Sequence, residues 1–225
     1  WDLLTELAAR LHDWNSKINL VSRKDVMNLV PSHIVPCMTM AKVKQFGSNE
    51  RVIDIGTGGG LPGLPMAILN PQAEFTLLDS VGKKLVVVED IRKSLQLDNV
   101  RVVNARAEDH AAQGHRYDVL LGRAVSNLPH FLSFTCDLIS DSSDSSDGLY
   151  YLKGGEFSDE IRNAGVDEGA CTIHRVQQLA NGAITSDKNV LFVPAAEVVT
   201  FQSRRDRVVE WLAQQKKRER AARQQ

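Results

Sequence analysis

The chain has 225 residues, 43% of them hydrophobic and 24% charged, and a formal net charge of −1, which is the balance of an ordinary globular protein. This length suits one large α/β domain or two small ones. No run of 18 or more apolar residues occurs, which excludes a transmembrane helix and predicts no membrane partner. The three cysteines lie far apart without a C-x-x-C pair, so a disulfide framework and a structural zinc site are not expected, and a reducing compartment fits best.

The first 45 residues are predicted to form an N-terminal helical cap. Leucines recur at helical spacing over residues 2–14, which indicates an amphipathic helix, and a second helical stretch runs from Ser32 to about Val43. The chain begins with Trp1 and carries no signal peptide. We therefore expect a cytoplasmic protein, or a plastid or mitochondrial one if a targeting segment precedes Trp1.

Strand and helix patterns alternate through the middle of the chain. Residues 51–55 are almost continuously apolar, as in a parallel strand buried on both faces. The elements predicted after them are a helix ending at Leu69, a strand over 74–78, a helix over 82–95, strands over 100–104 and 117–121, a helix over 128–138 and a strand over 149–152. This alternation predicts a mostly parallel sheet of the α/β class with right-handed crossovers. Two last strands, over 171–178 and 189–193, have no helix between them and predict a C-terminal β-hairpin.

Two charged segments differ in composition from the rest of the chain. Ser140–Asp147 consists only of serine and aspartate and cannot bury apolar surface, so we expect a disordered acidic insert over 139–148. Residues 201–225 are predicted to form a basic C-terminal helix, with eight basic and three acidic residues between Arg204 and Gln225. A basic end indicates a polyanionic partner, although a solvated amphipathic helix would have the same composition.

A glycine-rich turn follows the first predicted strand. Five of the eight residues from Gly56 to Gly63 are glycine. Glycine costs about 0.5–1 kcal/mol relative to alanine in regular structure, and it is used where the backbone takes positive φ or approaches a ligand closely. Pro62 stands in the first turn of the following helix, where proline is favoured. A strand, a glycine turn and a helix in this order form the loop that holds a nucleotide-like cofactor in doubly wound α/β folds.

Two classes of cofactor are compatible with this turn. Gly58-x-Gly60-x-x-Gly63 fits the dinucleotide pattern, with Asp79 in the place of the ribose-binding acid 21 residues after Gly58. Enzymes that use S-adenosylmethionine have the same topology and the same acid. Asp54 before the turn, Glu108 after the third strand and Arg123 after the fourth favour S-adenosylmethionine. Nothing downstream resembles a second mononucleotide-binding half, and an NAD-dependent oxidoreductase is the alternative.

Further motifs follow the glycine turn in an order that is typical of one family. They are Trp14–Asn15–x–x–Ile18–Asn19–Leu20, His33–Ile34, the stretch from Asp54 to Gly63, Leu78–Asp79–Ser80–x–Gly82–Lys83–Lys84, Arg106–Ala107–Glu108, Arg123–Ala124–Val125–x–x–Leu128 and Leu152–Lys153–Gly154. Together they resemble the RsmG (GidB) family of small-subunit ribosomal RNA guanine-N7 methyltransferases, over about residues 10–195.

The resemblance implies a fold, a cofactor and a substrate. The fold would be that of a Rossmann-like class I S-adenosylmethionine-dependent methyltransferase over residues 46–200, with a mostly parallel seven-stranded sheet. The substrate would be a guanosine in the 530 loop of small-subunit (16S-type) rRNA, methylated at N7 by a monomer without a metal or a general base. The cofactor contacts would be Gly56, Leu61, Ala107, Glu108 and Arg123, and the ribose argument adds Asp79. Candidate RNA contacts are His33, Lys83, Lys84, Lys153 and the basic C-terminal helix.

The chain also departs from the family pattern. The usual Arg-His-Ile-x-Asp-Ser is replaced by Ser32–His33–Ile34–Val35–Pro36–Cys37, so that a cation, an acid and a hydroxyl are lost together. A catalytically inert rRNA-binding protein that kept the methyltransferase fold is therefore a second alternative.

Overall fold

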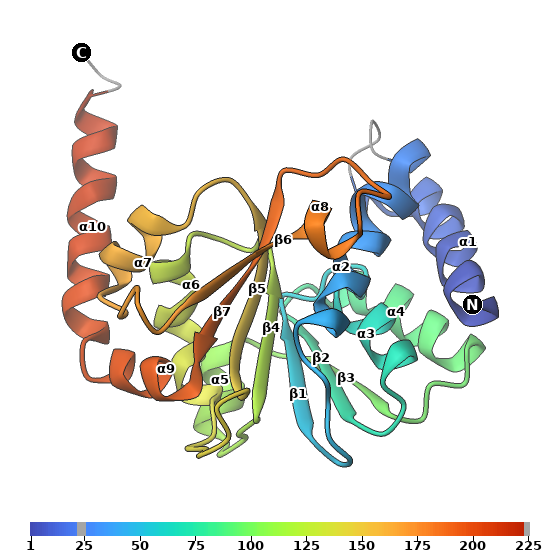
Figure 1. Cartoon of the computed structure of the whole chain (residues 1–225), viewed down its shortest axis with the longest axis horizontal. Helices are drawn as coiled ribbons and strands as arrows, with labels where there is room; N and C mark the ends of the chain where they lie inside the picture. The colour runs from blue at the N-terminus through green and yellow to red at the C-terminus, as the bar shows by residue number, and fades with distance from the viewer. Residues whose placement is uncertain (22–25, 223–225) are drawn as a thin grey trace.

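The computed structural model describes residues 1–21 and 26–222. Their strands form one seven-stranded sheet in the order β3-β2-β1-β4-β5-β7-β6 (Figure 1). Neighbouring strands from β3 through β5 run parallel, whereas β7 is antiparallel to both β5 and β6. The mostly parallel sheet and the C-terminal hairpin are thereby confirmed. The strands are β1 Arg51–Ile55, β2 Glu74–Asp79, β3 Val100–Asn104, β4 Val119–Arg123, β5 Gly148–Gly154, β6 Thr172–Arg175 and β7 Lys188–Pro194.

Helices cover both faces of the sheet, with α1–α4 on one side and α5–α7, α9 and α10 on the other (Figure 1). No helix in the described part of the chain is both long and apolar enough to cross a membrane. The helices are α1 Asp2–Lys17, η1 Val26–Asn28, η2 Val30–Ile34, α2 Val35–Met38, η3 Thr39–Lys42, α3 Gly63–Leu69, α4 Gly82–Ser94, α5 Ala107–Ala112, α6 Leu128–Thr135, η4 Cys136–Leu138, α7 Ser158–Ala164, α8 Val176–Leu179, α9 Ala195–Gln202 and α10 Arg205–Ala222.

The apolar run of β1 supplies both hydrophobic cores. Val52 packs into the core beneath α1–α4, whereas Ile53 and Ile55 pack into the core on the opposite face. All three side chains are buried, because successive side chains of a strand point to opposite faces and each face of this sheet carries helices. The continuous apolar character of the sequence thus follows from burial on both faces.

The second helical stretch of the N-terminal cap begins earlier than predicted and is irregular. It consists of short 3₁₀, π-helical and α-helical pieces from Val26 to Lys42. Pro31 lies in the π-helical piece and Pro36 in the short α2. Since proline has no N–H to donate and its ring crowds the preceding turn, two prolines five residues apart prevent one continuous α-helix.

Several other elements differ from their predicted bounds. β4 begins at Val119 rather than residue 117, because Tyr117 forms only an isolated bridge to Ile139. The short helices α5 and α7 were not predicted, and β6 ends at Arg175, where α8 begins. These helices span one or two turns, too short for an apolar periodicity to appear in the sequence.

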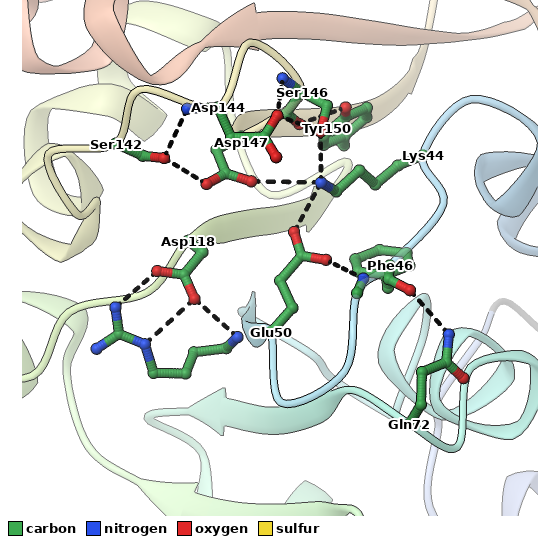
Figure 2. A network of polar contacts seen from close by, with 12 residues as sticks. Lys44, Phe46, Glu50, Gln72, Asp118, Ser142, Asp144, Ser146, Asp147 and Tyr150 are labelled. Carbon is green, nitrogen blue, oxygen red and sulfur yellow. Dashed lines mark hydrogen bonds and ion pairs between the residues drawn. The ribbon is translucent and has the colours of Figure 1, made fainter.

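The acidic insert over 139–148 makes side-chain contacts with the N-terminal part of the chain and within itself (Figure 2). Lys44 is 3% exposed, and its Nζ lies 3.3 Å from Oδ1 of Asp147 and 2.7 Å from Oε1 of Glu50. The Ser142 hydroxyl donates to the other oxygen of Asp147 at 2.6 Å. A cation roughly one hundred residues away in sequence thus supplies the partner that a serine–aspartate segment lacks by itself.

The basic C-terminal segment forms α10, and its last three residues, 223–225, lie outside the described residues. Val208 is buried and Leu212 packs against the core, whereas Val209 is exposed. The helix runs along the sheet from the edge where the strands begin and continues past the edge where the parallel strands end (Figure 1). The apolar contacts that the structure describes therefore fasten the first half of α10 to the protein.

Candidate cofactor and substrate cleft

A cleft of about 810 Å³ opens where β1, β2, β4 and β5 end. This is the edge at which open α/β sheets bind ligands. Each of the predicted cofactor-contact residues lines it, namely Gly56, Leu61, Asp79, Ala107, Glu108 and Arg123. Three of the predicted RNA-contact residues, His33, Lys84 and Lys153, line it as well. Lys83 does not, and its side chain is exposed on α4.

The glycines of the turn are required by backbone shape and by close packing. Gly56 has φ +70° and Gly60 has φ +90°, conformations that side chains other than glycine rarely adopt. A Cβ on Gly56 would lie 3.0 Å from Cγ2 of Val125, and one on Gly60 would overlap the Leu64 side chain. These two positions therefore require glycine for the backbone shape of the turn and for its packing against Val125 and Leu64.

Asp54 organises the turn from below rather than facing the cleft. Its side chain is fully buried and is not part of the cleft lining, which corrects the interpretation that it points at the ligand. One oxygen accepts a hydrogen bond from the Thr57 hydroxyl at 2.6 Å and another from the Gly63 N–H at 2.9 Å. The second oxygen has no hydrogen-bond partner among the described residues. Burial outweighs these donors and raises the pKa of Asp54 to about 6.

Asp79 lies at the end of β2 and is held in one orientation. Its two carboxylate oxygens accept from the N–H groups of Gly58 at 2.9 Å and Val81 at 2.8 Å, and Asn104 donates to its main-chain oxygen. The side chain is 6% exposed and lines the cleft. A carboxylate has about four lone-pair sites, so each oxygen retains capacity for a ligand hydroxyl. The arrangement suits a pair of neighbouring hydroxyls.

Arg123 at the end of β4 connects the sheet to the N-terminal cap. Its Nη1 donates to Nδ1 of His33 at 2.9 Å. Because a guanidinium has only donors, Nδ1 is the acceptor and the ring proton is on Nε2. His33 is the one residue of the altered segment 32–37 that lines the cleft, among the residues that the structure describes. Cys37 is a core thiol whose pKa burial raises to about 11, so it is not a nucleophile.

Lys153 at the end of β5 forms an ion pair with Glu160 of α7. The same Glu160 carboxylate accepts from the Leu128 N–H, the first residue of α6, at 2.7 Å. One side chain thereby fixes both a lysine of the cleft and the start of the helix beside it. Within the described ranges, no group of three or more His, Cys, Asp or Glu side chains could hold a metal ion.

Sequence reasoning missed part of the cleft wall. His130 and Phe134 of α6 line the cleft, as do Ser126 before that helix and Lys188 at the start of β7. The spacing of four residues between His130 and Phe134 places them on one face of a helix, which is the signal that the sequence contained. The sequence motifs assigned no functional residue to the part of this helix after Leu128.

The sheet order, the glycine turn and the acid at the end of β2 define a Rossmann-like class I methyltransferase fold. Solved structures with this fold include a chain of the fibrillarin/Nop5p complex, with a TM-score of 0.53, 10% identity and coverage of 71% of this chain and 82% of that one. The CurJ carbon methyltransferase has a TM-score of 0.52, 15% identity and coverage of 72% and 54%. These likenesses concern the fold alone.

The sequence model described as GidB, rRNA small subunit methyltransferase G, matches residues 2–190, and the chain belongs to that family. Its relatives include the ribosomal RNA small subunit methyltransferase G of Flavobacterium johnsoniae, 38% identical over 81% of this chain and 85% of the relative. The same enzyme of Cytophaga hutchinsonii is 41% identical over 67% of this chain and 72% of the relative. The expected family is thus confirmed, and it favours the methyl-donor interpretation over the dinucleotide alternative.

Proposed function

We propose that this chain is an S-adenosylmethionine-dependent methyltransferase that methylates N7 of a guanosine in the 530 loop of small-subunit rRNA. Its relatives are named for ribosomal RNA small subunit methylation. The observation that carries the proposal is that one cleft joins the six predicted cofactor contacts to cations at its rim. Because the relatives that we compared are bacterial, the proposal assigns the cytoplasm as the compartment.

The residues present fit this cofactor. A cleft of about 810 Å³ lies within the usual range for small-molecule sites, about 300–1,000 Å³. Asp79 would accept both ribose hydroxyls, the backbone from Gly56 to Leu61 would hold the amino-acid half, and Ala107 and Glu108 would border the adenine. When bound, the cofactor supplies a methyl group made electrophilic by a sulfonium.

The chain's own contribution to the reaction would be placement. Guanine N7 has an exposed lone pair and carries no proton at neutral pH, so no general base is needed. The protein must align N7 with the methyl carbon at about 3–3.5 Å and exclude competing geometries. Arg123, His33 and Lys153 stand at the substrate side of the cleft, where their donors can bind the RNA.

Cofactor binding is tested by calorimetric titration with S-adenosylhomocysteine. We expect micromolar affinity that is lost in Asp79→Ala, which removes the ribose acceptor, and in Gly56→Arg, which fills the turn. Asp98→Ala is the matched control, because Asp98 is an exposed acid in the loop before β3 and outside the cleft. Binding of NAD with no response to S-adenosylhomocysteine would overturn the proposal.

The RNA substrate is tested by methyl transfer to deproteinised and to subunit-assembled small-subunit RNA, with 7-methylguanosine mapped by chemical cleavage. We expect incorporation at one guanosine of the 530 loop, and none when that guanosine is replaced by adenosine. A protein that binds both S-adenosylhomocysteine and rRNA but transfers no methyl group would be the inert alternative, and the proposed activity would be rejected.

A further inference from the structure

Phe134 is the aromatic surface of the cleft. Among the residues that the structure describes, it is the one Phe, Tyr or Trp side chain in the cleft lining. It is half-buried: one side packs against the core formed by α5–α7, α9 and the sheet, and the remainder borders the cleft. Near the ends of β4 and β5 the lining also carries the polar side chains of Arg123, Ser126 and Lys153, beside the exposed aliphatic Val125. A flat aromatic surface beside these polar groups suits a flat ligand group.

The Phe134 ring packs against two other rings of α6. Phe131 and His130 meet it edge-on, each with ring centroids 5.4 Å away and interplanar angles of 70° and 68°. Phe131 in turn packs on Tyr151 of β5 at 4.7 Å, and the Tyr151 hydroxyl donates to the Ser126 carbonyl at 2.6 Å. A surface supported in this way loses little conformational entropy when a ligand binds to it.

The start of α6 is fixed at the substrate side of the cleft. Asn127 caps the helix by accepting from the His130 N–H at 3.0 Å, and Glu160 binds both the Leu128 N–H and Lys153. The helix follows β4, whose end carries Arg123, whereas the adenine is assigned to α5 after β3. In the same wall of the cleft, Nδ1 of His130 is buried and has no hydrogen-bond partner among the described residues.

We propose that Phe134 stacks on the target guanine and binds the base more tightly as it is methylated. The proposal rests on the proposed function and names the residue that holds the substrate base. An unpaired base presents its face to aromatic side chains, and loss of one such stack typically weakens binding by about 10-fold or more. Phe134 would therefore contribute to RNA affinity even in the absence of cofactor.

The reaction itself adds a second contribution. N7 forms a bond to the methyl carbon as the carbon–sulfur bond breaks, the electron pair stays on sulfur, and no proton moves. Positive charge consequently passes from the sulfonium to the base. A cation is attracted to the face of an aromatic ring, so the stack strengthens while this charge develops. An interaction that is stronger in the transition state than in the ground state raises kcat as well as lowering KM.

Three variants, two at Phe134 and one at a control position, test the proposal. Phe134→Leu keeps an apolar side chain but removes the ring, and Phe134→Tyr keeps the ring. Phe192→Leu is the matched control, because Phe192 is half-buried on β7, stacks on Tyr150 at 4.7 Å and does not line the cleft. We expect Phe134→Leu to lower kcat/KM for RNA by about 10- to 100-fold, partly through kcat. Phe134→Tyr and the control should stay within about threefold of the unmodified chain.

Binding without cofactor provides a readout that does not depend on turnover. The unmodified chain should bind an RNA that carries 7-methylguanosine more tightly than the same RNA with guanosine, and Phe134→Leu should abolish the difference. S-adenosylhomocysteine affinity should be equal in all variants; a loss confined to Phe134→Leu would make the ring an adenine platform and overturn the proposal. Full activity of Phe134→Leu would also overturn it. Absence of RNA methylation by the unmodified chain would instead reject the proposed function.

Discussion

At the edge of the sheet where the strands begin, the buried Lys44 lies within reach of the buried Asp147 and the partly buried Glu50 (Figure 2). At the edge where the strands end, the buried carboxylate of Asp54 has only a hydroxyl and a backbone N–H as partners, and one of its oxygens has none among the described residues. In the first arrangement a lysine neutralises two carboxylates, whereas in the second a carboxylate lies beneath a glycine turn.

The two arrangements have different roles: the first connects distant parts of the fold, and the second shapes the turn beside the cleft. Lys44 joins the N-terminal cap to the loop before β5, so its ion pairs connect distant parts of the chain. Asp54 instead shapes nine residues around one turn, and its burial carries a free-energy cost that shows as a raised pKa. The network at the edge where the strands begin thus connects distant segments, whereas Asp54 at the other edge fixes the geometry of one turn.

The largest effect is expected when the ion-pair network at the edge where the strands begin is broken. Lys44→Met leaves the buried Asp147 and the partly buried Glu50 without their cation, and removal of one partner from a buried ion pair costs about 3–5 kcal/mol of unfolding free energy. Urea unfolding measures this loss. S-adenosylhomocysteine affinity of the folded variant should not change, because the network lies at the opposite edge of the sheet from the cleft.

The control is the triple variant Lys44→Met, Glu50→Gln, Asp147→Asn, which removes the charges together. It should recover a large part of the lost stability, since no uncompensated charge stays buried. Equal stability of the single and triple variants would contradict the assignment of the network to charge pairing. A weakened cleft in the single variant would contradict the separation of the two edges.

A somewhat smaller effect is expected at the ending edge, and it depends on pH. Burial raises the pKa of Asp54 from 3.8 to about 6, so between about pH 4 and 6 the folded chain binds more protons than the unfolded chain. Through this group, the unfolding free energy therefore falls as the pH rises across that window. Because one pKa unit corresponds to about 1.4 kcal/mol, the change amounts to about 3 kcal/mol.

Asp54→Asn isolates this contribution. The amide oxygen can still accept from Thr57 and Gly63, so the turn should persist, and any fixed cost of the unpartnered amide does not vary with pH. In urea unfolding at pH 4, 5, 6 and 7, the unfolding free energy of the variant should increase relative to that of the unmodified chain as the pH rises. Parallel pH profiles would mean that Asp54 is not titrating in this window.

Much of the fold was predictable because the relevant signals are local. The apolar run of β1 and the glycine turn after it fix a strand and a backbone shape within a dozen residues, and β1 and β3 were found at their predicted bounds. The six residues predicted as cofactor contacts, five of them from the family resemblance, line one cleft, since the ends of parallel strands meet at one edge.

The parts that were missed depend on contacts between distant segments. The acidic insert contacts Lys44, whose burial no local pattern indicates. Asp54 was expected to face the ligand, but whether a strand residue lies in a cleft or beneath a turn depends on the helix that packs over it. In the sequence, Phe134 looks like any core aromatic residue. Its position in the cleft lining is visible only in the folded chain.

The smallest expected effect concerns α10, whose second half extends past the ending edge of the sheet (Figure 1). Lys216 and Lys217 are exposed there, and neither forms an ion pair with a described residue. If they bind RNA phosphates, Lys216→Gln, Lys217→Gln should weaken RNA binding a few-fold and reduce the slope of log affinity against log salt by about 1.4, since each phosphate contact contributes about 0.7 on single strands.

The matched control for α10 removes the same charge at the opposite edge. Lys93 and Arg101 are exposed at the end of α4 and on β3, and Lys93 has only a surface ion pair with Glu89. If α10 contacts the RNA specifically, Lys93→Gln, Arg101→Gln should leave the salt slope unchanged. A general attraction of the whole protein for RNA would instead lower the slope equally in both double variants. Equal salt slopes for the two double variants would mean that α10 is a solvated helix. A smaller slope in the α10 variant alone would mean that α10 adds an RNA-binding surface, and this surface lies beyond the part of the chain that the family model matches.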